Sequence, residues 1–292
     1  METLKTPAEM RAWADDRRRA GRTIGLVPTM GALHDAHLAL VAGAAERCDD
    51  VVVSIFVNPL QFNERSDFDS YPRPIDADVD ACEAAGVAAV YAPTGQAMYS
   101  DGFQTRVVPG ALAGLMEGPG RPGHFEGVAT VVLKLFNAVR PDVAMFGMKD
   151  YQQWRIVTQM ATDLDTGVDV VGHPIVRDPD GLAQSSRNVR LDTDQRAAAV
   201  CVPRSLDAAI DAAAESGSSP IDAVAAALAV VNAEPLARHE YTTVFDQRTL
   251  EEVTDFAETG RSVGAVRIAT AVWFGDVRLI DNRDLFDDQR GG

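Results

Sequence analysis

The chain has 292 residues, of which 46% are apolar, enough for a substantial core in one large domain or two smaller ones. Its formal net charge of −16 argues against nucleic acid or an anionic membrane as a partner, because an acidic protein repels both. No apolar run is long enough for a membrane-spanning helix, and three widely spaced cysteines indicate a reduced, cytoplasmic protein.

The first half of the chain alternates between strand-like and helical patterns. Residues 1–21 are typical of an amphipathic helix rather than a signal peptide. Beyond them, the pattern predicts strands at residues 23–28, 50–57, 87–92, 142–146 and 168–171, and helices at residues 34–47, 74–86, 127–139 and 150–164. This alternation predicts a parallel, doubly wound α/β sheet that binds ligands beyond the carboxyl ends of its strands.

The pattern changes after about residue 176. Two alanine-rich helical segments precede three strand-like runs, at residues 192–216, 220–232, 240–245, 263–272 and 276–280. Helices followed by strands, without alternation, predict a smaller α+β domain. We therefore expect one domain over residues 1–176 and a second over 177–292, with a hinge in the loop 177–188.

The strongest candidate site follows the first of these strands, at residues 28–37. The segment opens a helix, where unsatisfied backbone N–H groups attract phosphate. His34 and His37 are spaced i, i+3, so both imidazoles lie on one face of the first turn and can donate to the same phosphate. Metal binding and simple helix capping are the alternatives for this pair.

Two further segments carry cationic groups. Gly147 and Lys149 lie where a strand enters a helix, and Lys149 is one of only three lysines in the chain. The alternative is a solvated lysine before a helix capped by Asp150. In the loop 184–188, two hydroxyls and a guanidinium could bind a polyphosphate, although Ser-Ser-Arg is also common in surface loops.

The remaining two segments suggest a pocket and its cover. Residues 56–62 place amides beside an apolar strand end, which suits a small molecule with hydroxyl and carboxylate groups. Gln153 could complete this pocket, whereas the alternative is a structural turn. The glycine- and proline-rich loop 117–125 could exclude water from a site, or it could be an ordinary surface loop.

Together these segments resemble the pantothenate synthetase family of the HIGH-motif nucleotidyltransferases, and the similarity covers almost the whole chain. The motifs that carry it are VPTMGALHxxH, SIFVNPxQF, RPxHFxGVxTVVxKLF, FGxKDYQQ and SSRN, in this order. The resemblance implies a Rossmann-like N-terminal domain, a smaller C-terminal lid domain and a homodimer. It also implies that ATP, Mg²⁺, (R)-pantoate and β-alanine give pantothenate, AMP and pyrophosphate through a pantoyl adenylate.

The resemblance also implies roles for individual residues. The nucleotide would be bound by Met30, Gly31, Ala32, Leu33, His34, Asp35, Ala36, His37, Gly147, Met148, Lys149, Asp150, Val176, Gln184, Ser185, Ser186 and Arg187. Catalysis would involve His37 as the acid, with His34, Lys149, Ser185, Ser186 and Arg187. Gln61 and Gln153 would hold pantoate, with Gln61 also near β-alanine.

Three positions depart from the family pattern. Ala36 replaces the usual glycine before the second histidine, so its methyl group could press on the nucleotide. Gln184 replaces the usual methionine before Ser-Ser-Arg. The acidic stretch Asp76-Ala77-Asp78 is interrupted where the family often has consecutive aspartates near the metal, so no protein ligand for a metal is assigned.

Two other functions remain open at this stage. A nucleotidyltransferase with another acceptor would share the phosphate-binding segments but would not need Gln61 and Gln153. A non-catalytic nucleotide-binding homologue, weakened by Ala36, would not need the set His34, His37, Lys149 and Arg187.

Overall fold

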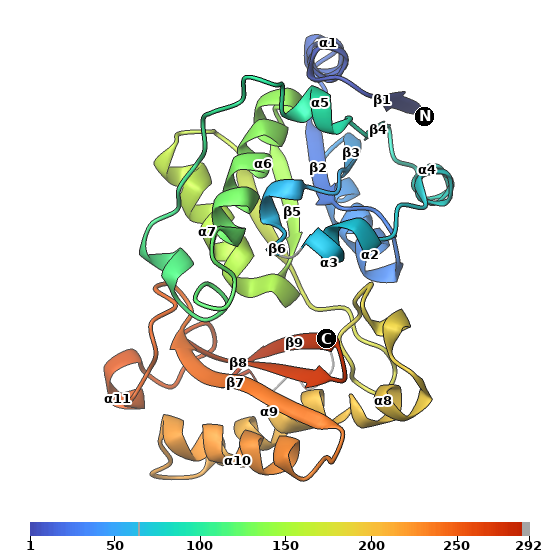
Figure 1. Cartoon of the computed structure of the whole chain (residues 1–292). Coiled ribbons are helices and arrows are strands. Elements are labelled where there is room, and N and C mark those ends of the chain that lie inside the picture. The colour runs from blue at the N-terminus through green and yellow to red at the C-terminus, as the bar shows by residue number, and fades with distance from the viewer. Residues whose placement is uncertain (64, 288–292) are drawn as a thin grey trace. The chain divides into compact units, whose positions relative to one another are not determined.

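The computed structural model describes residues 1–63 and 65–287, and Ser66 and Asp67 by their backbone alone. Figure 1 shows the elements along the chain. Two compact units are distinguished: one contains Met1–Met148 and Gln152–His173, and the other contains Lys149–Tyr151 and the chain from Pro174 onward. None of the described helices has the length and apolarity needed to cross a bilayer.

The first unit is built on a six-stranded sheet in which every pair of neighbouring strands is parallel. The strand order is β1-β4-β3-β2-β5-β6, with β1 Glu2–Leu4, β2 Ile24–Thr29, β3 Asp50–Ile55, β4 Ala89–Tyr91, β5 Val143–Gly147 and β6 Asp169–His173. All six residues of β3 are buried, as expected of a strand with both faces covered. The predicted Rossmann-like sheet is thus confirmed.

Helices cover both faces of this sheet (Figure 1). The α-helices are α1 Pro7–Arg19, α2 Asp35–Ala45, α3 Arg65–Ser70, α4 Ile75–Ala84, α5 Gly95–Met98, α6 His124–Val139 and α7 Tyr151–Asp163. Three short 3₁₀ turns are η1 Pro59–Gln61, η2 Ala111–Gly114 and η3 Met148–Asp150. One apolar cluster joins α1, α6 and α7 to the sheet, and a second joins α2 and α4 to it.

The N-terminal segment differs from the sequence prediction. Residues 1–21 were predicted to be helical throughout, whereas Glu2–Leu4 form strand β1 beside β4. The helix begins only at Pro7, because Thr6 accepts the Glu9 N–H and the Glu9 side chain accepts the Thr6 N–H in a capping box. Proline at the first helical position fixes the same boundary.

The strand order reverses direction at β2, which has β3 on one side and β5 on the other. Gly25 pairs with Val143 and Leu26 with Ala144, so the carboxyl ends of β2 and β5 reach the same edge of the sheet. Ligands of doubly wound sheets bind at such a switch point. The segments that follow Thr29 and Gly147 therefore start where a nucleotide is expected.

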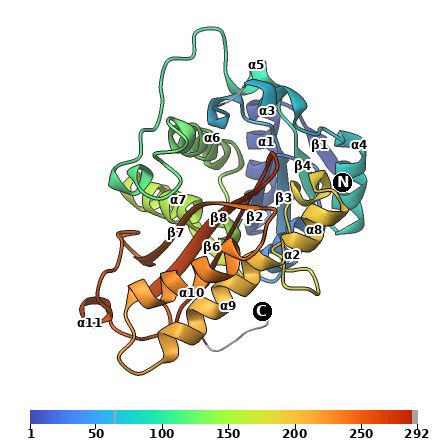
Figure 2. The same ribbon diagram turned by 60° about the horizontal axis from the view of Figure 1, so that its bottom comes forward.

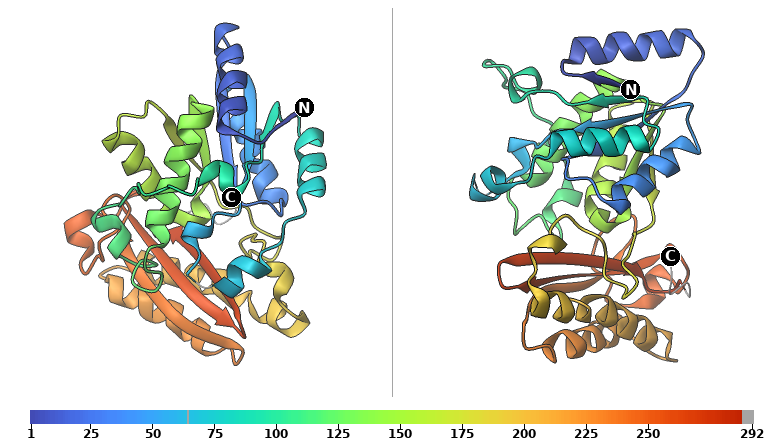
Figure 3. Two further views of the ribbon diagram at one scale, coloured as in Figure 1. Left: turned by 45° about the horizontal axis from the view of Figure 1, so that its top comes forward. Right: turned by 90° about the vertical axis from the view of Figure 1, so that its right-hand side faces the viewer.

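The second unit contains a three-stranded antiparallel sheet in the order β7-β8-β9, with β7 Ala237–Asp246, β8 Val266–Phe274 and β9 Val277–Asp284. Its helices are α8 Thr193–Ala198, α9 Cys201–Ala214, α10 Pro220–Asn232 and α11 Phe256–Thr259, with the 3₁₀ turn η4 Asn188–Arg190. Helices α9 and α10 lie side by side against this sheet (Figures 2 and 3). The predicted α+β character is confirmed.

The helix predicted over residues 192–216 is divided into α8 and α9. Pro203 lies in the first turn of α9, where a missing backbone N–H leaves no gap in the helix. In one continuous helix over 192–216, the same proline would be an interior residue and would remove a hydrogen bond. The chain therefore ends α8 at Ala198 and starts a new helix at Cys201.

Candidate active site

The turn that leads from β2 into α2 has two residues with a left-handed backbone. Gly31 has a φ of 86° and Ala32 a φ of 51°. Such a conformation costs a non-glycine residue about 1–2 kcal/mol. The Asp78 carboxylate accepts the Ala32 N–H at 2.9 Å and the Leu33 N–H at 2.8 Å. Each hydrogen bond to a charged acceptor contributes about 1.5–3 kcal/mol, so Asp78 offsets the strain at Ala32.

The Asp78 carboxylate limits which groups of the segment 28–37 could bind a phosphate. The N–H groups of Ala32 and Leu33 are already used by Asp78, and the His37 N–H donates to the His34 carbonyl oxygen at 2.8 Å. These three backbone groups are therefore satisfied within the protein. The sequence-based expectation of phosphate on backbone N–H groups thus shifts to the side chains of His34 and His37.

The two histidines form the first turn of α2, with His34 at the N-cap and His37 three residues later. Their ring centroids are 4.2 Å apart, which confirms that both rings lie on one face. The backbone N–H of His34 donates to Nδ1 of His37 at 3.3 Å. An accepting Nδ1 carries no proton, so the neutral His37 ring carries its proton on Nε2. His37 is thereby prepared to donate from Nε2.

Gln61 lies at the end of η1, close to the same turn. Its Nε2 is 3.1 Å from the sulfur of Met30, and its Oε1 accepts a hydrogen bond from Asn58 at 3.0 Å. The buried Asn58 side chain accepts a hydrogen bond from the hydroxyl of Tyr99 at 2.8 Å. The structure thus brings two of the predicted segments, 28–37 and 56–62, together at the carboxyl ends of β2 and β3.

The loop between η2 and α6 is fastened at both ends. The buried amide of Gln152 accepts the Glu117 N–H at 3.0 Å and donates to the carbonyl oxygens of Leu112 and Leu115. At the other end, Nδ1 of the buried His124 lies 2.7 Å from the Gln61 carbonyl oxygen. Gln152 stands in the FGxKDYQQ motif, yet only the structure reveals what it holds.

After β5, the side chain of Met148 points into the protein, whereas that of Lys149 is partly exposed. The side chain of Met148 packs against β6, where a Cβ on Gly172 would lie 2.8 Å from the Met148 sulfur. Lys149 is 19% exposed, and its Nζ donates to Oδ2 of Asp150 at 3.1 Å. Gln153 follows in the first turn of α7 with a half-buried side chain, and its sharing of a pocket with Gln61 stays a prediction.

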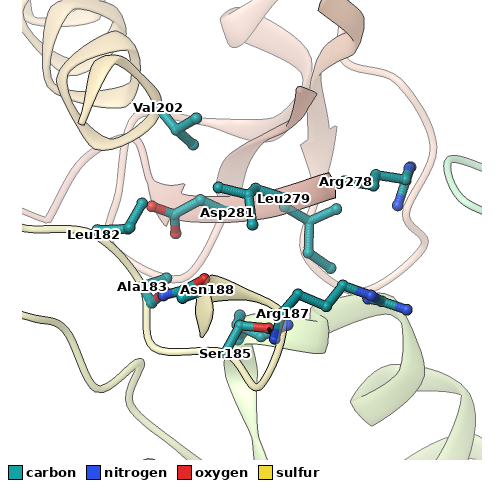
Figure 4. Close-up of a pocket in the computed structure, with 11 residues that line it drawn as sticks. Leu182, Ala183, Ser185, Arg187, Asn188, Val202, Arg278, Leu279 and Asp281 are labelled. Atoms are coloured by element: carbon teal, nitrogen blue, oxygen red, sulfur yellow. Dashed lines mark hydrogen bonds between the residues drawn. The ribbon is translucent and has the colours of Figure 1, made fainter. Parts of the chain in front are cut away.

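A pocket of the second unit contains several cationic side chains (Figure 4). It is lined by Lys149, Leu182, Ala183, Ser185, Arg187, Asn188, Val202, Arg278, Leu279, Ile280 and Asp281. Within the described part of the chain, no carboxylate forms an ion pair with Arg187. Because the chain as a whole carries a net charge of −16, cationic groups gathered on one pocket indicate an anionic ligand.

The other charged groups of this pocket are paired. Arg278 donates to both carboxylate oxygens of Glu240, at 2.8 and 2.9 Å, and these hydrogen bonds lower the pKa of Glu240 below its usual value. Asp281 is paired with Arg177 at 2.6 and 2.9 Å. Burial has the largest single effect and would lower the pKa of Arg177, but the charge and hydrogen bonds of Asp281, together with the charge of Asp207, outweigh it and raise that pKa. Arg187 is therefore the first candidate for binding phosphate, and Lys149, whose Asp150 partner is 45% exposed, is the second.

The predicted hinge region contains a short hairpin, residues 176–184, whose contacts lie within the second unit. Arg177 and Ala183 form an isolated antiparallel bridge, and the Gln184 N–H donates to the Val176 carbonyl oxygen at 2.9 Å. Arg196 pairs with Asp178 and Asp180 from the same hairpin. Beyond it, Ser185 Oγ accepts the Arg187 N–H at 3.3 Å, and Ser186 is half-buried.

The acidic stretch Asp76-Ala77-Asp78 lies in the first turn of α4. Asp76 is exposed, while both oxygens of Asp78 accept backbone N–H groups. Across residues 1–63 and 65–287, no three His, Cys, Asp or Glu side chains are grouped to hold a metal ion. Thiolate chemistry is also disfavoured, because burial raises the pKa of Cys82 and of Cys201 to about 11.

Comparisons with known proteins agree over nearly the whole chain. The family model described as pantoate–β-alanine ligase matches residues 2–284. The pantothenate synthetase of Heliobacterium modesticaldum is 47% identical over 97% of this chain and 98% of its own, and that of Agrobacterium fabrum is 48% identical over 97% and 95%.

Solved structures give the same result. Pantothenate synthetase from Thermus thermophilus matches with a TM-score of 0.90 at 43% identity, covering 98% of this chain and 100% of that one. Pantoate–β-alanine ligase from Francisella tularensis, complexed with β,γ-ATP and β-alanine, matches with a TM-score of 0.79 at 30% identity, covering 98% of each chain.

Proposed function

The chain belongs to the pantoate–β-alanine ligase family, and from that premise we propose that it joins (R)-pantoate to β-alanine through a pantoyl adenylate. ATP is consumed, and AMP and pyrophosphate are released. The membership confirms the resemblance predicted from the motifs and the prediction of a ligase of pantothenate biosynthesis. The intermediate and the two nucleotide products are part of the proposal.

In the first step, the pantoate carboxylate attacks the α-phosphorus of ATP and pyrophosphate leaves. This step needs positioning and neutralisation of charge rather than a nucleophilic side chain. We assign the phosphates to Lys149 and Arg187, with Ser185 and Ser186 beside them. His37 donates from Nε2 to the charge that develops on the phosphates, and His34 assists it.

The proposed ATP contacts are the turn Met30–His37, the segment Gly147–Asp150, Val176 and the loop Gln184–Arg187. Gln61 and Gln153 hold pantoate. In the second step the neutral amine of β-alanine attacks the adenylate carbonyl and AMP leaves. Because an acyl adenylate is prone to hydrolysis, we propose that residues 177–292 act as a lid that excludes water from the nucleotide and pantoate bound by residues 1–176.

The observation that carries this proposal is the shared pocket of Lys149 and Arg187 in a strongly acidic chain. An ammonium and a forked guanidinium are complementary donors for polyphosphate oxygens. A protein that bound no phosphate-bearing ligand would have no need to hold these two cations together against a net charge of −16.

We propose Mg²⁺ as the metal, because it is commonly bound through substrate phosphates with few protein carboxylates. Such binding does not require three grouped protein ligands, and the described residues contain no group of three. When bound, Mg²⁺ would neutralise charge on the β- and γ-phosphates. We further propose a homodimer that works in the cytoplasm, and sedimentation of the purified chain tests the dimer.

A coupled pyrophosphate assay tests the reaction. We expect pyrophosphate only when pantoate and Mg²⁺ accompany ATP, and a further burst of turnover when β-alanine is added. Release that ignores pantoate but follows another acceptor would identify a different nucleotidyltransferase. ATP binding without release under any of these conditions would identify a non-catalytic homologue.

A further inference from the structure

One buried carboxylate joins two elements that are far apart in the sequence. Asp78 lies on α4 and is 3% exposed, and its two oxygens accept the N–H groups of Ala32 and Leu33 in the turn before α2. A carboxylate buried to this extent must have its charge satisfied by hydrogen bonds. Both partners belong to a single turn, so Asp78 acts as a clamp on that turn.

We propose that Asp78 is a positioning residue that fixes His37 in its proton-donating form. Its action through the turn is independent of any contact with substrate. The inference rests on the proposed function only for the step in which His37 donates to phosphate. The clamp itself, and its effect on the imidazole, stand on the geometry of residues 31–37.

The effect passes through one peptide group. Leu33 is held by Asp78, and the next residue, His34, directs its own backbone N–H at Nδ1 of His37. That hydrogen bond keeps Nδ1 unprotonated and leaves the proton on Nε2. Release of the Leu33 N–H lets the peptide before His34 rotate, which removes the donor that selects this tautomer.

The glycine of the turn fits the same role. A Cβ on Gly31 would lie 2.8 Å from Oδ2 of Asp78 and 3.2 Å from the side chain of Ile55. Any side chain at position 31 would therefore collide with the carboxylate of Asp78. A neutral amide at position 78 would turn its NH₂ group toward one of the two N–H donors, so it can satisfy only one of them.

The test compares Asp78→Asn with Asp80→Asn, a charge-matched control at an exposed position of the same helix. Nitrogen-15 spectra of the histidine side chains report the tautomer without any need for turnover, and His37→Gln assigns the signal. We expect Asp78→Asn to shift the His37 signal away from the pure Nε2–H form. We expect Asp80→Asn to leave it unchanged.

In the same variant we expect kcat to fall by about 10- to 100-fold, because a catalytic group displaced by about 1 Å loses activity of this order. The KM for pantoate should stay the same, and added Mg²⁺ should not restore the rate. Recovery at high Mg²⁺ would make Asp78 a metal ligand and overturn the proposal. An unchanged His37 signal in folded Asp78→Asn would overturn it as well.

Asp78→Glu keeps the charge but moves the carboxylate, and it serves where the amide variant does not fold. The same displaced His37 signal is expected, and an unchanged signal contradicts the clamp. If the spectra change as expected while the wild-type protein releases no pyrophosphate, the clamp holds and the proposed function fails. The two outcomes are therefore distinguishable.

Discussion

The side-chain amide of Asn58 donates to Oε1 of Gln61 at 3.0 Å and to the carbonyl oxygen of Gly127 at 3.0 Å. The helix that carries Gly127 packs tightly here, since a Cβ at this position would lie 2.3 Å from the Leu60 carbonyl oxygen. The orientation of the Gln61 amide is therefore fixed by the core, with its Nε2 as the remaining donor. This relationship suits a residue that must present one defined group to pantoate.

Replacing Tyr99 by phenylalanine tests that orientation from a distance. Its hydroxyl donates to Oδ1 of Asn58 at 2.8 Å, and burial raises the pKa of the phenol above its usual value, so it stays a donor. Loss of one hydrogen bond of about 1 kcal/mol should raise the KM for pantoate about fivefold and leave the KM for ATP unchanged.

The control is Tyr91→Phe, at another buried tyrosine, whose hydroxyl donates to the sulfur of Met98 at 3.7 Å. It should change neither KM. If Tyr99→Phe and Tyr91→Phe change the KM values equally, Tyr99 acts only through general stability. An unchanged KM for pantoate in Tyr99→Phe would contradict the binding of pantoate by Gln61.

Replacing Arg187 tests the phosphate pocket. A lysine cannot reproduce the fork of a guanidinium, so Arg187→Lys should lower kcat/KM for ATP by about tenfold and Arg187→Ala by about 100-fold. Steady-state kinetics at saturating pantoate measure this. Arg190→Ala, at an exposed position three residues later, is the control and should stay near wild type. Equal losses at both positions would contradict a specific role for Arg187.

The sequence predicted the sheet and the elements that carry the candidate residues, because alternating apolar runs and helical spacing are local signals. It missed β1, a strand of three residues that exists only through its pairing with β4. It also treated residues 192–216 as one helix, because alanine-rich composition outweighed the single Pro203. Short elements defined by tertiary contacts leave no periodic pattern to read.

The candidate site shows the same limit. The spacing of His34 and His37 correctly predicted that both rings lie on one face of α2. The role of Asp78 could not be predicted from the sequence, since its hydrogen-bond partners lie in a turn more than 40 residues earlier. Gln152 was visible within a motif, and only the loop it holds reveals its use. Hydrogen bonds between distant segments follow from the fold, so they become predictable only after it is known.

Ala36→Gly tests the departure from the family pattern at the second position of α2. If the methyl group crowds the nucleotide, its removal relieves about 1–3 kcal/mol, and the KM for ATP should fall by about tenfold or more. Glycine within a helix costs about 1 kcal/mol, so the free energy of unfolding should fall at the same time. Ala39→Gly, on the same helix, should show the stability loss alone. An unchanged KM in Ala36→Gly would mean that the backbone already accommodates the methyl group.

The ion pair between Arg177 and Asp281 should contribute more to the free energy of unfolding than an exposed ion pair does. Both side chains are largely buried, at 12% and 1% exposure. Asp281→Asn leaves a buried guanidinium without its counter-charge, which typically costs about 3–5 kcal/mol of unfolding free energy. Urea denaturation measures the change. Glu126→Gln breaks the more exposed pair with Arg106 and should cost less than about 1 kcal/mol. Similar losses in the two variants would contradict the assignment.

Oxygen transfer from pantoate tests the central claim, that the carboxylate is activated as an adenylate. Pantoate with ¹⁸O in both carboxylate positions is turned over with ATP and β-alanine, and the products are analysed by mass spectrometry. Attack on the α-phosphorus predicts one ¹⁸O in AMP, one in pantothenate and none in pyrophosphate. Formation of ADP with ¹⁸O in inorganic phosphate would show attack on the γ-phosphorus and contradict the adenylate.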